Sequence, residues 1–207
     1  MTFEDKRLEW AAELQFLSQC ALAYCQDKYD IERFQRIREI SVEMAAAVAG
    51  LPVDDVKDVF CAGSGYQTPK LDTRAAVLRD GRLLLVQEED GRWALPGGWV
   101  DYDLTLRENA AKEVLEEAGM VVRPVRVIAL QDHNRRNSTR YPFNICSAFI
   151  LCEYVSGAFT PNMETVACGF FGPEEIPSPL ATGKTTREQI DMCFGAAADP
   201  GWVTQFD

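Results

Sequence analysis

The chain has little of several residue types that mark common functional classes. Its 207 residues include one histidine and seven cysteines, and no two cysteines follow the C-x-x-C spacing. A zinc site of cysteine and histidine would therefore lack ligands at a suitable spacing. We expect most of the thiols to stay reduced and to pack as small apolar groups.

Long apolar runs and an excess of basic residues are also missing. No stretch reaches the roughly eighteen apolar residues of a membrane-spanning helix. The first residues, MTFEDKRLEW, lack the basic start and apolar core of a signal peptide. We therefore expect a soluble, cytoplasmic protein. The formal net charge is −11, from 21 basic and 32 acidic side chains. This balance argues against nucleic acid or an anionic membrane as a partner.

Helical patterns occupy residues 1–67. The first helix is expected from Thr2 to about Tyr29, with one apolar stripe formed by Trp10, Leu14, Leu17, Ala21 and Tyr24. Asp30 is the expected N-cap of a second helix that ends before Gly50, and a third is expected over 53–60. Such a small unit has a marginal core, so we expect it to form a homodimer. The alternative is a hairpin that only covers its own domain.

Residues 68–207 mix strand and helix patterns. The dipeptide Asp80-Gly81 between two apolar runs predicts a β-hairpin, and a helix is predicted from Leu106 to Ala118, with Gly119 as its C-terminal stop. The elements do not alternate as regular βαβ units. The sequence therefore predicts an α+β fold, with a mixed sheet between helices and a small all-α N-terminal domain before it.

Three carboxylates fall on one face of the predicted helix. Glu113, Glu116 and Glu117 follow the i, i+3, i+4 spacing. The opposite face is apolar and suited to a core; it carries Ala111, Val114, Leu115 and Ala118. Like charges so close repel unless a cation joins them. The pattern therefore predicts a site for a hard divalent cation such as Mg²⁺, with Mn²⁺ as a substitute.

The string from Gly98 to Met120 resembles the Nudix box of the MutT-like pyrophosphohydrolases. It matches the glycine at Gly98, the Glu-x-x-Glu-Glu run and Gly119, but Leu104 and Lys112 stand where the box has glutamate and arginine. In the family these two positions are thought to pair. Losing the acid and weakening the base together is a consistent change, and it leaves the metal-binding glutamates intact.

The resemblance covers nearly the whole chain. A helical N-terminus before a Nudix domain is similar to a subfamily that includes CDP-choline and ADP-ribose pyrophosphatases. It implies an α/β/α sandwich and a metal-dependent enzyme. That enzyme would cleave the diphosphate bridge of a nucleoside diphosphate derivative into a nucleoside monophosphate and a phosphorylated remainder. The alternative is a Nudix-like module that binds such a nucleotide derivative without hydrolysing it.

The resemblance also implies roles for individual residues. The metal ligands would be Glu113, Glu116, Glu117 and the backbone carbonyl of Gly97. For activating the water that attacks phosphorus, Glu117 is the first candidate and Glu164 the second, because glutamates there would reach the ions from two sides. For Glu164, a solvated loop acid is the alternative.

Candidates for binding the substrate come from the arginines, because a guanidinium fork matches phosphate oxygens. They are Arg74 at the start of a strand and Arg135 and Arg136 on the loop DHNRRNSTRY. A charged, mobile loop is the alternative for the last two. Trp93 or Trp99 would suit stacking against a base, although buried aromatics more often belong to a core.

Overall fold

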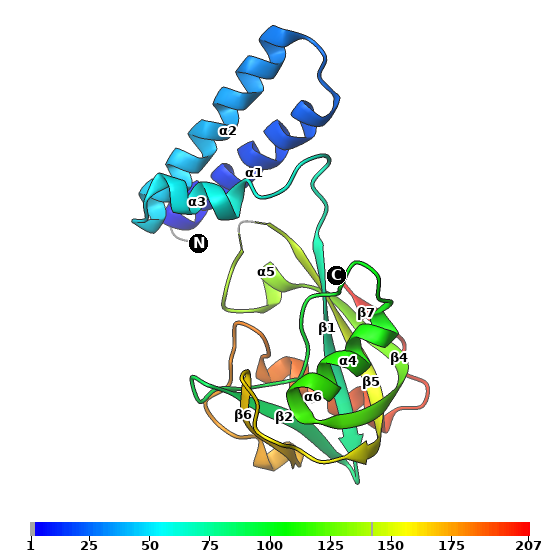
Figure 1. Ribbon diagram of the computed structural model, residues 1–207. Helices are drawn as coiled ribbons and strands as arrows, with labels where there is room; N and C mark the ends of the chain where they lie inside the picture. Colours follow the sequence, from blue (N-terminus) through cyan, green and yellow to red (C-terminus); the bar gives the residue numbers. More distant parts are fainter. Residues whose placement is uncertain (1–2, 142) are drawn as a thin grey trace. The chain divides into compact units, whose positions relative to one another are not determined.

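Two units make up the chain in the computed structural model, one ending at Pro69 and the other beginning at Lys70. The structure describes residues 3–141 and 143–207 (Figure 1). Within those ranges, no helix has both the length and the apolar character needed to cross a membrane.

The described residues of the first unit form three helices: α1 (Phe3–Tyr24), α2 (Lys28–Ala49) and α3 (Val53–Phe60). Asp27, and not the predicted Asp30, is the N-cap of α2. Its side chain accepts hydrogen bonds from the backbone N–H groups of Tyr29 and Asp30, at 2.9 and 3.1 Å. The prediction was wrong because α1 ends at Tyr24, which lets α2 begin earlier.

The apolar stripe of α1 is largely exposed in the single chain. Trp10, Leu17 and Tyr24 are 47%, 51% and 72% exposed. The buried positions of this helix carry small or polar side chains instead: Ala11, Gln15, Ser18 and Gln19. Burying large apolar residues of this kind is strongly favourable, so the outer face of α1 is a surface suited to a further packing partner.

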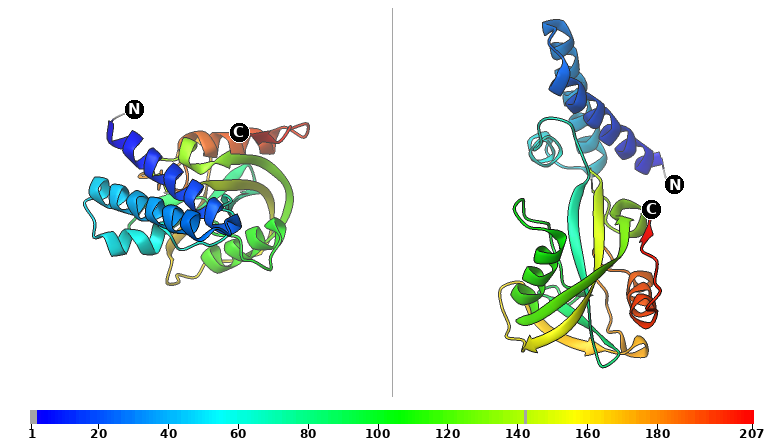
Figure 2. Two further views of the ribbon diagram at one scale, coloured as in Figure 1. Left: turned by 90° about the horizontal axis from the view of Figure 1, so that it is seen from above. Right: turned by 90° about the vertical axis from the view of Figure 1, so that its right-hand side faces the viewer.

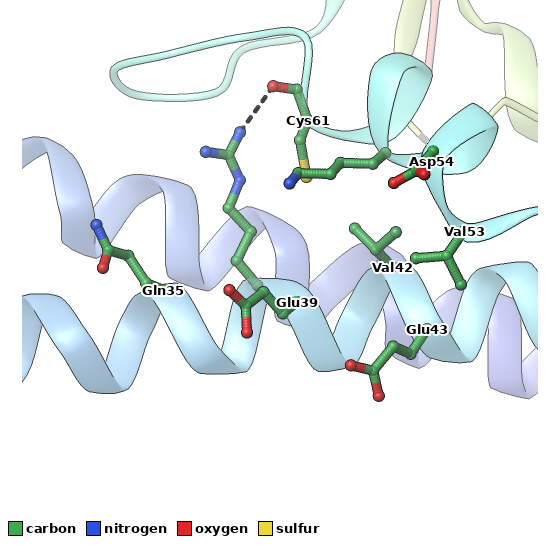
Figure 3. Close-up of a pocket in the computed structure, with 9 residues that line it drawn as sticks. Gln35, Glu39, Val42, Glu43, Val53, Asp54 and Cys61 are labelled. Atoms are coloured by element: carbon green, nitrogen blue, oxygen red, sulfur yellow. Dashed lines mark hydrogen bonds between the residues drawn. The ribbon is translucent and has the colours of Figure 1, made fainter.

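A pocket of about 320 Å³ lies between α2 and α3 (Figure 3). The Arg38 side chain extends toward the end of α3, and its Nη2 donates to the carbonyls of Cys61 and Gly63, each at 3.0 Å. The guanidinium is thus held by backbone oxygens. Arg38 therefore braces α2 against the segment that follows α3.

The second unit is a mixed sheet with helices on both faces. Its described strands are β1 (Lys70–Arg79), β2 (Arg82–Glu88), β3 (Trp93–Ala94), β4 (Met120–Asp132), β5 (Ile145–Gly157), β6 (Thr165–Phe171) and β7 (Gln205–Phe206). The order is β3-β2-β1-β5-β4-β7, with β6 paired to β2. Pairs β1–β5 and β4–β7 are parallel and the other pairs are antiparallel.

The helices of this unit are α4 (Leu106–Ala118), the short α5 (His133–Arg136), a 3₁₀ turn η1 (Pro173–Glu175) and α6 (Arg187–Ala198). α4 and α6 cover opposite faces of the sheet (Figure 2). Val114 lies in the core on the α4 side, and Ile190 lies in the core on the α6 side. The predicted α+β class, with a mixed sheet between helices, is confirmed.

The Pro-Gly-Gly corner lies along β1. Backbone hydrogen bonds run from Thr73 to Gly98 at 2.9 Å and from Ala75 to Pro96 at 2.8 Å. Gly97, between them, has a φ of +149°, and a Cβ there would lie 2.0 Å from the Thr73 carbonyl oxygen. Glycine is therefore required at this position. The corner is fixed to β1 before α4 begins.

Candidate active site

Local sequence signals fix both ends of α4. Thr105 and Glu108 form a capping box at its start, and Gly119 ends it in the left-handed conformation, so the predicted bounds are confirmed. The buried row is Ala110, Val114 and Ala118, at a spacing of four. Leu115, which was expected on the buried face, is 53% exposed because it lies beside this row.

The three glutamates of α4 differ in their surroundings. Glu113 is 9% exposed, and a Cβ on Gly98 would lie 2.7 Å from its Oε2. Glu117 accepts a hydrogen bond from the backbone N–H of Gly97 at 3.1 Å. The Glu116 side chain is 54% exposed. The second glycine of the corner thus makes room for Glu113, and the first contacts Glu117 directly.

Burial changes the acidity of two of these carboxyls. It raises the pKa of Glu117 to about 7, although the Gly97 N–H and the charge of Arg74 act in the opposite direction. Burial also raises the pKa of Glu113, which the charges of Glu116 and Glu164 raise further while Lys112 lowers it. A nearby cation would stabilise the ionised form of both carboxyls and lower their pKa values.

Lys112 occupies the middle of the acidic face. Its Nζ lies 2.8 Å from Glu116 Oε2, 3.5 Å from Glu113 Oε1 and 3.4 Å from Asp101 Oδ2. In the Nudix box, the acid that pairs with this position would stand where this chain has Leu104. Asp101, three residues earlier, supplies that acid. Spacing within the box could not show this, because the loop turns back on itself where Leu104 N–H donates to the Asp101 carbonyl at 3.1 Å.

The donor set fits a hard divalent cation. The candidate ligands are oxygens, and the Lys112 ammonium already lies between two of them as a stand-in cation. Among the described residues, no three acidic, histidine or cysteine side chains converge on one point as they stand. Binding an ion would therefore require Lys112 and the glutamates to shift.

A cavity of about 360 Å³ brings the two catalytic candidates together. Glu117 and Glu164 both line it, with Glu164 on the loop before β6. Lys184, the one basic residue among the described residues that line it, pairs with Glu88 at 2.7 Å and lowers the pKa of Glu117 by its charge. Sequence reasoning missed Lys184, because nothing in ATGKTT places that turn beside α4.

The Lys184 turn is attached to the strand that leads into the corner. The Leu95 N–H donates to Thr185 Oγ1 at 3.0 Å, and Ala181 N–H donates to the Trp93 carbonyl at 2.8 Å. Thr185 is fully buried. The turn that carries Lys184 is therefore joined by hydrogen bonds to the segment that leads into the corner.

Arg74 braces the corner and is 7% exposed. Its Nε and Nη2 donate to Asp72 Oδ2 at 3.2 and 2.8 Å, and its Nη1 donates to the Gly97 carbonyl at 2.9 Å. The carbonyl predicted as a metal ligand is thus engaged by an arginine in this structure. A role for Arg74 in binding substrate stays a prediction that this geometry does not favour.

The two loop arginines both lie in the short helix α5. The Arg135 side chain is 76% exposed and pairs with Asp132 at 3.4 Å. Arg136 pairs with Asp207 through two nitrogens, Nε at 3.2 Å and Nη2. Arg136 therefore ties this helix to the C-terminal segment, whereas Arg135 is exposed to solvent.

The two tryptophans separate into core and surface. Trp93 packs edge-on against Phe171 at a centroid distance of 5.2 Å beside the α6-side core. Trp99 is 46% exposed and forms a ring cluster with Tyr141 and Phe143, at 6.3 and 6.4 Å. Of the two, Trp99 is the more exposed, and the Lys70 ammonium lies over its ring at 5.5 Å.

Comparison with known proteins adds to this geometry. A sequence profile for the NUDIX domain matches residues 69–191. The chain belongs to the Nudix hydrolase family. A second profile, described as a UDP-X-like, N-terminal oligomerisation domain, matches residues 5–60. This Nudix protein therefore pairs a helical unit of oligomerising type with a pyrophosphohydrolase domain of a family that uses divalent metals.

Individual relatives agree with that assignment. A Bacillus subtilis strain 168 protein named "Putative ADP-ribose pyrophosphatase YjhB" is 34% identical over 99% of this chain and 98% of its own. The crystal structure of an ADP-ribose pyrophosphatase from Streptococcus suis 89-1591 is 48% identical, with a TM-score of 0.63 over 68% of this Nudix chain and all of its own. A UDP-X diphosphatase structure is 26% identical, with a TM-score of 0.62 over 99% of each chain.

The burial of Glu117 makes the metal-free protein sensitive to pH. The pKa is about 7 in the folded chain against an ordinary 4.5, so the stability from the protonated carboxyl is present below about pH 4.5 and lost as the pH rises through 7. In EDTA, Glu117→Gln is expected to lose less stability than the wild type between pH 5 and 7.5, by up to about 3 kcal/mol. Denaturant unfolding at both pH values measures this. The same pH dependence in both proteins would contradict it.

Proposed function

We propose that the protein is a Mg²⁺-dependent pyrophosphohydrolase, with Mn²⁺ as a substitute, for nucleoside diphosphates joined to a second group. Substrates of the ADP-ribose or CDP-choline type would give a nucleoside monophosphate and a phosphorylated remainder. The observation that supports this most is the shared cavity, which Glu117 and Glu164 enter from two elements. The intact glutamate face favours hydrolysis over the alternative of a binding module.

Glu113, Glu116 and Glu117 would hold the ions. A bound divalent ion would neutralise the phosphate oxygens and lower the pKa of a water molecule. Glu117 or Glu164 would accept the proton of the attacking water as the new P–O bond forms and the bridging P–O bond breaks. A carboxyl with a pKa near 7 is matched to that proton transfer at neutral pH. The leaving phosphate carries away the electron pair of the broken bond.

Lys184 would bind the diphosphate. It brings a positive charge into a cavity whose other charged residues are acidic: Glu88, Glu89, Asp90, Glu117 and Glu164. A phosphate oxygen would compete with Glu88 for the ammonium. Because the Lys184 turn is joined to Leu95, the charge stands at a set distance from the corner.

The helical unit would form a homodimer. The exposed aromatic and leucine side chains of α1 support this, since Trp10, Leu17 and Tyr24 gather a large apolar area on one helix. The family profile that matches this unit describes an oligomerisation domain.

A substrate panel with product identification tests the activity. With Mg²⁺ or Mn²⁺, we expect turnover of ADP-ribose, CDP-choline or a UDP-sugar, with a nucleoside monophosphate as one product. We expect nucleoside triphosphates, dinucleoside polyphosphates and NADH to react at least about tenfold more slowly, a difference of roughly 1.4 kcal/mol in activation free energy. Tight binding of one compound without turnover of any would contradict the proposal and favour a sensor.

A further inference from the structure

Lys112 lies where it would compete with a bound metal ion. Its ammonium contacts Glu116 at 2.8 Å and Glu113 at 3.5 Å, and both are candidate metal ligands. A cation held by the same carboxylates would repel the ammonium. The lysine therefore has to leave these oxygens, at least in part, when an ion binds.

Asp101 offers the ammonium a second partner outside the glutamate face. Its Oδ2 lies 3.4 Å from Lys112 Nζ, and its backbone N–H donates to Asn109 Oδ1 at 3.3 Å. Asn109 is fully buried and donates to Thr73 Oγ1 at 2.8 Å. Asp101 is thus held in place by α4 and, through Asn109, by β1, independently of the glutamates.

We propose that Lys112 is an exchangeable counter-ion and that Asp101 is the positioning residue that receives it. Without metal, the ammonium spans Glu113 and Glu116 and offsets their repulsion. When a divalent ion binds, the ammonium moves to Asp101 and leaves the glutamate oxygens to the ion. This inference rests on the proposed function, because it assumes that these glutamates bind the metal.

Lys112 also reduces the repulsion among the glutamates when no metal ion is bound. Burial is the main cause of the raised pKa of Glu113 and of Glu117; the charges of Glu116 and Glu164 raise that of Glu113 further, and the charge of Glu113 raises that of Glu117. Removing the ammonium altogether would leave this group of acids uncompensated before an ion arrives. An ammonium that can move to Asp101 offsets the charge of Glu113 and Glu116 when no ion is bound. It also leaves their oxygens accessible when an ion binds.

Mn²⁺ binding to the full chain, measured by calorimetry and by the electron paramagnetic resonance signal of free Mn²⁺, tests the exchange. Lys112→Met is expected to bind Mn²⁺ about tenfold more tightly, because a competing charge is gone. Methionine and lysine have similar helix propensities, so α4 should remain intact. Asp101→Asn is expected to bind about three- to tenfold more weakly, because Lys112 then has only the ligands as partners.

A double-mutant cycle separates exchange from simple charge. In the Lys112→Met background, Asp101→Asn should change the affinity by less than about twofold, because no ammonium remains to be positioned. Asp103→Asn removes the same charge from an exposed position on the same loop and should also change it by less than about twofold. Melting curves without metal check that each variant is folded.

The opposite results would overturn the inference. If Asp101→Asn weakens Mn²⁺ binding as much in the Lys112→Met background as in the wild type, Asp101 acts only as a nearby negative charge. Unchanged or weaker Mn²⁺ binding by Lys112→Met would show that the ammonium does not compete with the ion. If the wild type binds neither Mn²⁺ nor Mg²⁺, the metal site and with it the proposed function fail, whereas wild-type binding that no variant alters overturns the exchange alone.

Discussion

Replacing Glu117 with glutamine is expected to lower kcat by roughly 10²–10⁴-fold, the range for loss of a positioned proton acceptor. The same change removes a candidate metal ligand, so metal activation should weaken as well. Stability should not fall with activity. Glutamine resembles the protonated carboxyl that burial favours, so the variant should be at least as stable as the wild type at neutral pH.

Steady-state kinetics over a Mg²⁺ titration, together with thermal melting, measure both effects. Glu108→Gln is a matched control, since it removes one negative charge from the same helix and keeps a side chain able to complete the capping box. Its kcat should stay within about twofold of the wild type, because its charge lies in the first turn of α4 and is exposed. Near-normal turnover by Glu117→Gln would contradict the roles of Glu117 as proton acceptor and metal ligand.

Gly97→Ala is expected to have the largest effect on stability. The added Cβ would lie 2.0 Å from the Thr73 carbonyl oxygen, and alanine is strained at a φ of +149°. Relief requires the corner to leave β1, which breaks its strand-like hydrogen bonds and moves the N–H that contacts Glu117. We expect a loss of about 3 kcal/mol or more in the free energy of unfolding, and a loss of turnover with it.

Gly81→Ala separates strain from collision. Gly81 also has a positive φ, +73°, in the hairpin between β1 and β2, but a Cβ there meets no atom within 4 Å. It should cost about 1 kcal/mol, the cost of the left-handed conformation alone, and leave kcat unchanged. Equal unfolding midpoints for the two variants in denaturant would contradict this, because the corner would then accommodate the added Cβ without a further loss of stability.

Local signals explain what the sequence could predict. The capping box of Thr105 and the left-handed Gly119 set the bounds of α4, and Gly50 and Pro52 separate α2 from α3. These residues act on the backbone within a few positions, so no knowledge of distant contacts is needed. The spacing of Glu113, Glu116 and Glu117 is likewise a property of one helix. This is why the acidic face and the α+β class could be foreseen.

Contacts between distant segments could not be foreseen in the same way. The pairing of Lys112 with Asp101 depends on how a loop turns back, and the nearness of Lys184 to Glu117 depends on a turn that packs on Trp93 and Leu95. Arg74 was predicted at the start of a strand as a candidate for binding the substrate, but it lies inside β1, where Asp72 and Gly97 accept hydrogen bonds from its guanidinium. Sequence spacing carries no information on which partner such a charge meets.

The hydrogen bonds that join the Lys184 turn to Leu95 have a consequence for how the substrate range can change. Lys184 stands on a turn held by a buried hydrogen bond to Leu95, whereas Met163, which also lines the cavity, is 90% exposed, and Glu164 beside it lies on the loop before β6. Substitutions of Met163 would alter the shape of the cavity without disturbing the corner, whereas Asn162 beside it is fixed to the carbonyls of Glu116 and Glu117 by hydrogen bonds of 3.0 and 3.2 Å. Engineering this enzyme for a larger leaving group would therefore begin at Met163 and keep the two glycines of the Pro-Gly-Gly corner.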